Sequence, residues 1–93
     1  MNKYETVVIM DSKITDEERN QAINKIYTYI SDNGKITNKE ELGLKRLAYE
    51  VKKQKEAFYY VIYFEMKPEN IVELEKRYRI ADEVLKFIVV KKD

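Results

Sequence analysis

The sequence predicts an α+β fold, a two-layer sandwich in which two helices cover one face of a four-stranded antiparallel sheet. Three observations predict it. The chain has 93 residues, which suits a single domain spanning 1–93. Segments with strand-like and helix-like periodicity follow one another in the order βαββαβ. Each helical segment has one apolar stripe, so both helices can pack on the same face of the sheet.

The first strand and the first helix have distinct local signals. Residues Tyr4–Met10 are rich in β-branched side chains and are apolar on both faces, which favours a central strand. Thr15 and Glu18 have the spacing of a capping box, and the apolar residues that follow recur at helical spacing. We therefore expect a helix at about Asp16–Asp32. The Asn-Gly pair at 33–34 predicts a left-handed stop.

The middle of the chain predicts a hairpin with an irregular first strand. Along Lys35–Val51 the apolar residues change parity near Gly43, which indicates a bulge or bend. The polar segment Lys52–Glu56 is typical of a hairpin end, and its three lysines could contact phosphate or merely keep the tip soluble. Residues Ala57–Met66 alternate strictly and give the strongest strand signal.

The last third of the chain completes the sandwich. Pro68 suits the first position of a helix, the turn follows at 80–83, and Val84–Lys91 predicts the last strand. Right-handed crossovers place the first and third strands in the centre, in the order second, third, first, fourth. This is the ferredoxin-like βαββαβ arrangement.

The composition excludes several classes of function. The chain has no histidine and no cysteine, so imidazole bases, thiolate nucleophiles and the usual zinc ligands are absent. Gly34 and Gly43 are too far apart to form a phosphate loop. Acylphosphatases share the expected fold, but the loop at 11–14 has neither an arginine nor a row of glycines. We expect no catalytic residue, no metal, no cofactor and no small-molecule substrate.

The cellular setting follows from the apolar pattern. The start of the chain lacks the long apolar run of a signal peptide, and no segment has the length and hydrophobicity needed to span a bilayer. We therefore expect a cytoplasmic protein without a membrane partner.

The sheet face away from the helices has no third layer to cover it. Apolar and aromatic residues of three strands are expected there, and such a surface marks a partner site. In the alternative, charged neighbours and tyrosine hydroxyls keep this face hydrated in a monomer. The expected partner surface consists of Val7, Ile9, Tyr59, Val61, Tyr63, Ile88 and Val90.

The charge balance limits how the chain could bind RNA. The net charge is only +1, from 18 basic and 17 acidic side chains. A protein that binds nucleic acid alone usually has a clear basic excess. RNA binding therefore requires grouped cations or a second, basic protein. An RRM-like module that binds single-stranded RNA remains an alternative, in which Tyr59 and Tyr63 stack bases.

The segment Glu41–Tyr49 carries the most specific motif: Gly, any residue, a basic residue, a polar or charged residue, Leu, Ala or Ser, then Tyr. It resembles the diagnostic segment of the bacterial small-subunit ribosomal protein six family. Glu50 departs from the proline of many members, and Val51 from the usual isoleucine. The resemblance extends over nearly all of the chain, to Tyr4-Glu5, Glu65-Met66, Arg79-Ile80, Asp82 and Val89-Val90-Lys91.

The resemblance implies a structural, non-enzymatic protein of the small ribosomal subunit. Such proteins bind the central domain of 16S ribosomal RNA together with small-subunit ribosomal protein eighteen. The family motif carries an RNA-binding role over to Lys45, Arg46 and Tyr49, although Tyr49 could instead be a half-buried strand aromatic. From the residues themselves we add three rim cations that could meet the RNA backbone: Lys3, Arg79 and Lys86.

Overall fold

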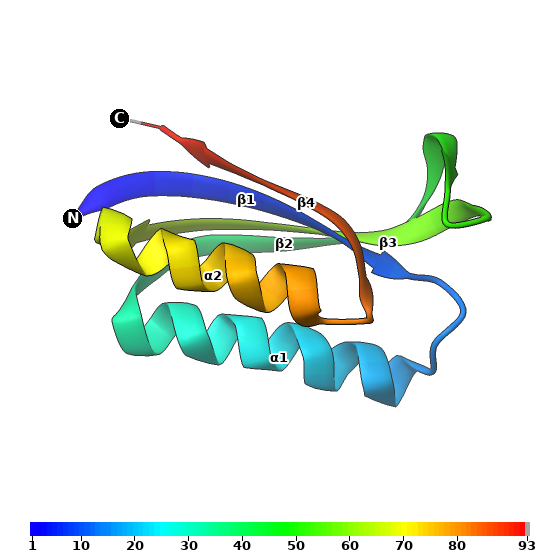
Figure 1. Cartoon of the computed structure of the whole chain (residues 1–93), viewed down its shortest axis with the longest axis horizontal. Coiled ribbons are helices and arrows are strands. Elements are labelled where there is room, and N and C mark those ends of the chain that lie inside the picture. The colour runs from blue at the N-terminus through cyan, green and yellow to red at the C-terminus, as the bar shows by residue number, and fades with distance from the viewer. Residues whose placement is uncertain (93) are drawn as a thin grey trace.

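The computed structural model, which describes residues 1–92, has the six elements in the predicted order. The sheet is antiparallel with the strand order β2-β3-β1-β4. Figure 1 shows both helices on one side of it. These observations confirm the ferredoxin-like two-layer sandwich. The elements are β1 (Asn2–Asp11), α1 (Asp16–Asn33), β2 (Gly34–Val51), β3 (Gln54–Met66), α2 (Pro68–Ile80) and β4 (Val84–Lys91).

The core lies between the helices and the two central strands. Alternate residues of β1 point under the helices, and Tyr4, Thr6 and Val8 are buried there as predicted. The even-numbered residues of β3 share this face because Val8 pairs with Tyr60 in register. The helices contribute apolar side chains at helical spacing, chiefly Ile23, Ile26, Tyr27 and Ile30 of α1 and Leu74 and Tyr78 of α2.

Helix α1 starts where the capping motif predicts but does not stop in the predicted way. Thr15 Oγ1 accepts a hydrogen bond from the backbone amide of Glu18 at 3.1 Å. At the other end Gly34 has φ −172°, which is extended backbone, so the predicted left-handed stop is wrong. Glycine is needed there because a Cβ atom would lie 2.1 Å from the carbonyl oxygen of Glu65 on β3. Among residues 1–92, no helix is long and apolar enough to cross a membrane.

Strand β2 is irregular at the position where its apolar parity changes. The β2–β3 register shifts between Glu41 and Gly43, and Gly43 has φ +78°. This confirms the predicted bulge, because a left-handed glycine in a strand lets one extra residue be accommodated. A further shift lies between Arg46 and Val51.

The β2–β3 pairing is irregular between Arg46 and Val51 and resumes next to the hairpin tip, where Val51 pairs with Gln54. Lys52 and Lys53 form the connecting turn, and β3 begins at Gln54, three residues earlier than Ala57, the predicted start. Gln54 is buried, and hydrogen bonds compensate for the burial of its side-chain amide. Its Oε1 accepts from the amide and the hydroxyl of Ser12, at 3.0 and 2.9 Å. In Figure 1 the green end of this hairpin extends past the other strands and rises on the side away from the helices.

Candidate protein and nucleic-acid interface

The sheet face opposite the helices brings together all seven residues of the predicted partner surface. They come from β3, β1 and β4, and the strand register arranges them in cross-strand rows. The rows have apolar or aromatic members throughout, apart from one charged residue in each of the two outer rows. From β3 through β1 to β4 they are Tyr63–Glu5–Val90, Val61–Val7–Ile88 and Tyr59–Ile9–Lys86.

Exposure differs across this partner surface. Val61 is only 8% exposed, because it lies between Val7 on β1 and Glu40 on β2. On the edge strand β4, Ile88 and Val90 are 50% and 44% exposed. Val61 therefore forms the floor of the surface, and the residues of the outer rows and of β4 offer most of its contact area.

Two apolar residues of the edge strand β2 were not singled out from the sequence as partner contacts. Leu42 and Leu44 are 41% and 51% exposed. The bulge at Gly43 displaces them from the regular alternation that buries apolar residues elsewhere in the sheet. The parity change was visible in the sequence, but it did not show that both leucines would be exposed.

The predicted cations Lys45 and Arg46 lie side by side on the projecting hairpin. Lys45 is opposite Ala57 of β3 and Arg46 is opposite Glu56, so the two side chains leave the strand on opposite faces. Both are exposed, and neither forms an ion pair within residues 1–92. Both are accessible to a polyanion.

Tyr49 links the hairpin to the far edge of the sheet. The Nζ atom of Lys86 on β4 donates a hydrogen bond to the Tyr49 hydroxyl at 2.6 Å and lies 5.1 Å from the centre of the ring. Tyr49 is exposed rather than half-buried. The long hairpin thus bends across the end of β1 and places an aromatic ring beside a cation from β4.

The remaining two predicted cations lie at opposite ends of the molecule. Arg79, in the last turn of α2, lines the same surface hollow as Lys86. Its guanidinium lies 3.8 Å from the Glu75 carboxylate. Lys3 is near the other end of β1, six positions before Ile9, which pairs with Lys86. At roughly 3.3 Å per residue this places Lys3 about 20 Å from the other cations. Five of the six predicted RNA-binding residues therefore gather at the hairpin end, and Lys3 does not.

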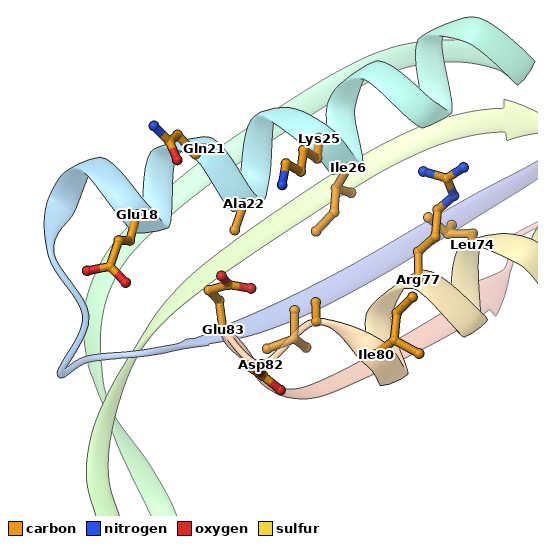
Figure 2. A pocket seen from close by; sticks show the side chains of 12 residues that line it. Glu18, Gln21, Ala22, Lys25, Ile26, Leu74, Arg77, Ile80, Asp82 and Glu83 are labelled. Carbon is orange, nitrogen blue, oxygen red and sulfur yellow. The ribbon is translucent and has the colours of Figure 1, made fainter.

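A hollow of about 390 Å³ lies between α1 and α2, with apolar residues such as Ile26 and Leu74 at its base (Figure 2). Its polar lining, within the described chain, consists of carboxylates, Gln21, Lys25 and Arg77, and includes no hydroxyl that could act as a nucleophile. Arg77 is itself paired with Glu73 at 3.1 Å.

Comparison with known proteins identifies the family. The family model described as ribosomal protein S6 matches residues 3–91. The chain belongs to the ribosomal protein S6 family. It is 43% identical to small ribosomal subunit protein bS6 of Helicobacter acinonychis over 94 residues, which cover 100% of this chain and 66% of that protein. It is 38% identical to the bS6 protein of Alkaliphilus oremlandii, covering 98% of this chain and 97% of that protein.

The structural comparison agrees with the S6 assignment. The crystal structure of 30S ribosomal protein S6 from Thermotoga maritima superposes with a TM-score of 0.93 at 32% identity, covering 98% of this chain and 87% of that one. The fold of this S6-family chain is therefore that of its solved relative. The chain spans 65–67% of the length of the Helicobacter relatives.

Proposed function

We propose that this S6-family chain is a structural constituent of the small ribosomal subunit, in the cytoplasm, and has no catalytic activity. In this proposal it binds the central domain of 16S ribosomal RNA together with small-subunit protein eighteen. One observation carries the proposal: an uncovered apolar sheet face lies directly beside a group of exposed cations. The row Tyr59–Ile9–Lys86 joins the two surfaces within one register position.

The apolar part suits a protein partner rather than RNA alone. Contiguous exposed apolar surface on a small domain marks a protein contact, and the open face has Ile88 and Val90 exposed at its edge. Leu42 and Leu44 expose further apolar surface on the edge strand β2, although Leu44 lies opposite Phe58 and therefore faces the helix side of the sheet. A basic partner docked here would supply the positive charge that a chain of net charge +1 lacks.

The cationic part suits phosphate contacts. Lys45 and Arg46 project from the hairpin without carboxylate partners in the described residues, and Arg79 and Lys86 lie at the same end of the molecule. Phosphate contacts fix the position of a protein on RNA without reading its sequence. RNA recognition by shape and backbone contacts fits this arrangement.

The test is a titration of a central-domain 16S ribosomal RNA fragment with this protein, alone and with protein eighteen, at two salt concentrations. We expect binding by the pair only, and a steep loss of affinity with salt. Tight binding by the protein alone to any unstructured RNA would favour the RRM-like alternative instead. Failure of the pair to bind at either salt concentration would overturn the proposal.

A double variant tests the hairpin cations in the same assay. Lys45→Ala with Arg46→Ala removes two charges from the hairpin, whereas Lys25→Ala with Lys76→Ala removes two exposed charges from the helices. We expect the first pair to weaken RNA binding by about tenfold or more and to reduce the salt dependence, and the second to have little effect. Equal losses would mean that only the total charge matters.

A further inference from the structure

Three cations from three separate elements meet at a hollow of about 330 Å³ near the start of β4. Lys52 comes from the hairpin turn, Arg79 from the last turn of α2, and Lys86 from β4. Aromatic rings form part of its wall, and the Arg79 guanidinium lies 5.8 Å from the centre of the Phe87 ring. The hollow therefore combines grouped positive charge with an apolar base.

The charge at this hollow is unusual for this surface. In the described chain no carboxylate is among the residues that line it. Three other hollows on the molecule each include at least one carboxylate, such as Glu18, Asp32 and Glu65 respectively. In a chain with a net charge of only +1, a concave site whose charged lining residues are all cations concentrates positive potential and attracts an anion.

Lys52 reaches this hollow through a strained turn. Lys52 and Lys53 have φ values of +48° and +63°, in the left-handed region. Two-residue hairpin turns with this geometry strongly prefer asparagine and glycine, because other side chains are crowded there. Strained residues of this kind often lie at functional sites. The turn places a lysine at the hollow although glycine would fit the backbone better.

An exposed aromatic ring lies next to the hollow. Lys86, which lines the hollow, also donates to the hydroxyl of Tyr49, and Tyr49 is 63% exposed. Proteins that bind single-stranded nucleic acid combine cations along the backbone with aromatic rings on which bases stack. Lys86 connects the two parts here.

We propose that Lys52, Arg79 and Lys86 bind the phosphate of an unpaired RNA nucleotide whose base stacks on Tyr49. This inference rests on the proposed function and names the RNA feature that the hairpin end accepts. The nucleotide must be unpaired, because in a duplex the face of the base is covered by its neighbours and is not available to an aromatic side chain. Lys45 and Arg46 then contact the flanking backbone.

The turn itself offers a matched pair of variants. Lys52→Gly and Lys53→Gly each remove one charge and each place glycine at a left-handed position, but only Lys52 lines the hollow. The full chain, labelled with ¹⁵N, is titrated with hexa-adenylate and followed by NMR. We expect Lys52→Gly to weaken binding by about fivefold to tenfold and Lys53→Gly by less than about twofold. Similar losses in the two variants would overturn the phosphate assignment.

The stacking step has its own control. Tyr49→Phe keeps the ring and should bind hexa-adenylate within about twofold of the parent chain, whereas Tyr49→Ala should lose about tenfold. Equal effects of the two variants would show that the ring is not a stacking platform. Equally tight binding of a blunt RNA duplex of the same length would also overturn the requirement for an unpaired nucleotide.

These outcomes are separable from those of the proposed function. In one outcome, protein eighteen and the Lys52→Gly chain together bind the ribosomal RNA fragment with unchanged affinity, and hexa-adenylate binds the two turn variants equally. The nucleotide site is then wrong and the ribosomal role stands. If hexa-adenylate binding depends on Lys52 but the pair fails to bind ribosomal RNA, the ribosomal role is wrong and the nucleotide site stands. Thermal melting of both glycine variants checks that each is folded.

Discussion

The hydroxyl oxygen of Tyr78 lies 3.1 Å from Oγ1 of Thr6, a residue 72 positions away in the chain. The single hydroxyl proton of Thr6 is donated to the backbone oxygen of Ile88 at 2.8 Å. The Tyr78 hydroxyl is therefore the donor in the first bond. These two consecutive hydrogen bonds connect α2 to β1 and β1 to β4. The Thr6 and Tyr78 hydroxyls are shielded from water there. Both side chains are almost fully buried.

Removing the Thr6 hydroxyl, the acceptor of the Tyr78 bond, should lower the free energy of unfolding more than removing the Tyr78 hydroxyl, the donor. Thr6→Val leaves the buried Tyr78 hydroxyl without a partner, so we expect a loss of about 1–3 kcal/mol in the free energy of unfolding. Adding Tyr78→Phe to Thr6→Val removes this unpaired hydroxyl. The double variant should therefore lose less free energy of unfolding than the sum of the losses in the two single variants. Urea unfolding of the four proteins measures this. Strictly additive losses would show that the two hydroxyls do not interact.

The same tyrosine makes stability depend on pH in alkaline solution. Burial raises the pKa of Tyr78 well above its ordinary value of 10.0. Below pH 10 both states are protonated and the full stability is present. Above it the unfolded tyrosine ionises first, so the unfolded state binds fewer protons and stability falls, by at most about 1.4 kcal/mol per pH unit from this group.

The comparison of the parent chain with Tyr78→Phe isolates this effect. Urea unfolding at pH 8 and pH 11 should show a smaller alkaline loss for Tyr78→Phe than for the parent. Tyr27, whose pKa is also raised by burial and by the nearby Glu41 carboxylate, keeps its contribution in both proteins. If the parent and Tyr78→Phe lose the same stability between pH 8 and pH 11, Tyr78 ionises in the folded protein as easily as in the unfolded one.

The sequence predicts the fold well and the interface only in part. The strand order and the burial of Thr6 follow from periodicity and from the handedness of crossovers, which are local or topological rules. The meeting of Tyr49 with Lys86 depends instead on how far a long hairpin twists and bends, which no local pattern encodes. For the same reason the sequence could not decide whether Lys52 contacts phosphate or only keeps the hairpin tip soluble. The distance of Lys3 from the other cations was not foreseen.

The two glycines of the chain should respond differently to substitution. At Gly34 the backbone is extended, and an added Cβ would meet the Glu65 carbonyl oxygen at 2.1 Å, forcing β2 away from β3. Gly34→Ala should therefore lower the free energy of unfolding by about 3 kcal/mol. At Gly43 the surrounding space is open, and only the left-handed backbone conformation disfavours a side chain. Gly43→Ala should therefore lower the free energy of unfolding by about 1 kcal/mol.

Asparagine separates the two mechanisms. It tolerates left-handed backbone, so Gly43→Asn should recover most of the loss seen with alanine. Gly34→Asn should recover nothing, because the obstacle there is a backbone atom of β3 rather than a dihedral angle. Thermal unfolding of the four variants tests this. Recovery by asparagine at Gly34 would show that the strands separate easily at this point.

The open sheet face and the β2 edge are alternative docking sites for the proposed protein partner. Tyr59→Ala with Tyr63→Ala removes the aromatic side chains of two rows, and Leu42→Ser with Leu44→Ser removes the exposed apolar side chains of the edge. Removing both aromatic side chains from the outer rows should cost about 2 kcal/mol of binding free energy in total, so we expect the tyrosine variant to weaken association with protein eighteen by about thirtyfold. Calorimetric titration of both variants, with circular dichroism to check folding, distinguishes the sites. A loss confined to the leucine variant would move the partner to the β2 edge, where backbone groups of an unpaired strand are available for pairing.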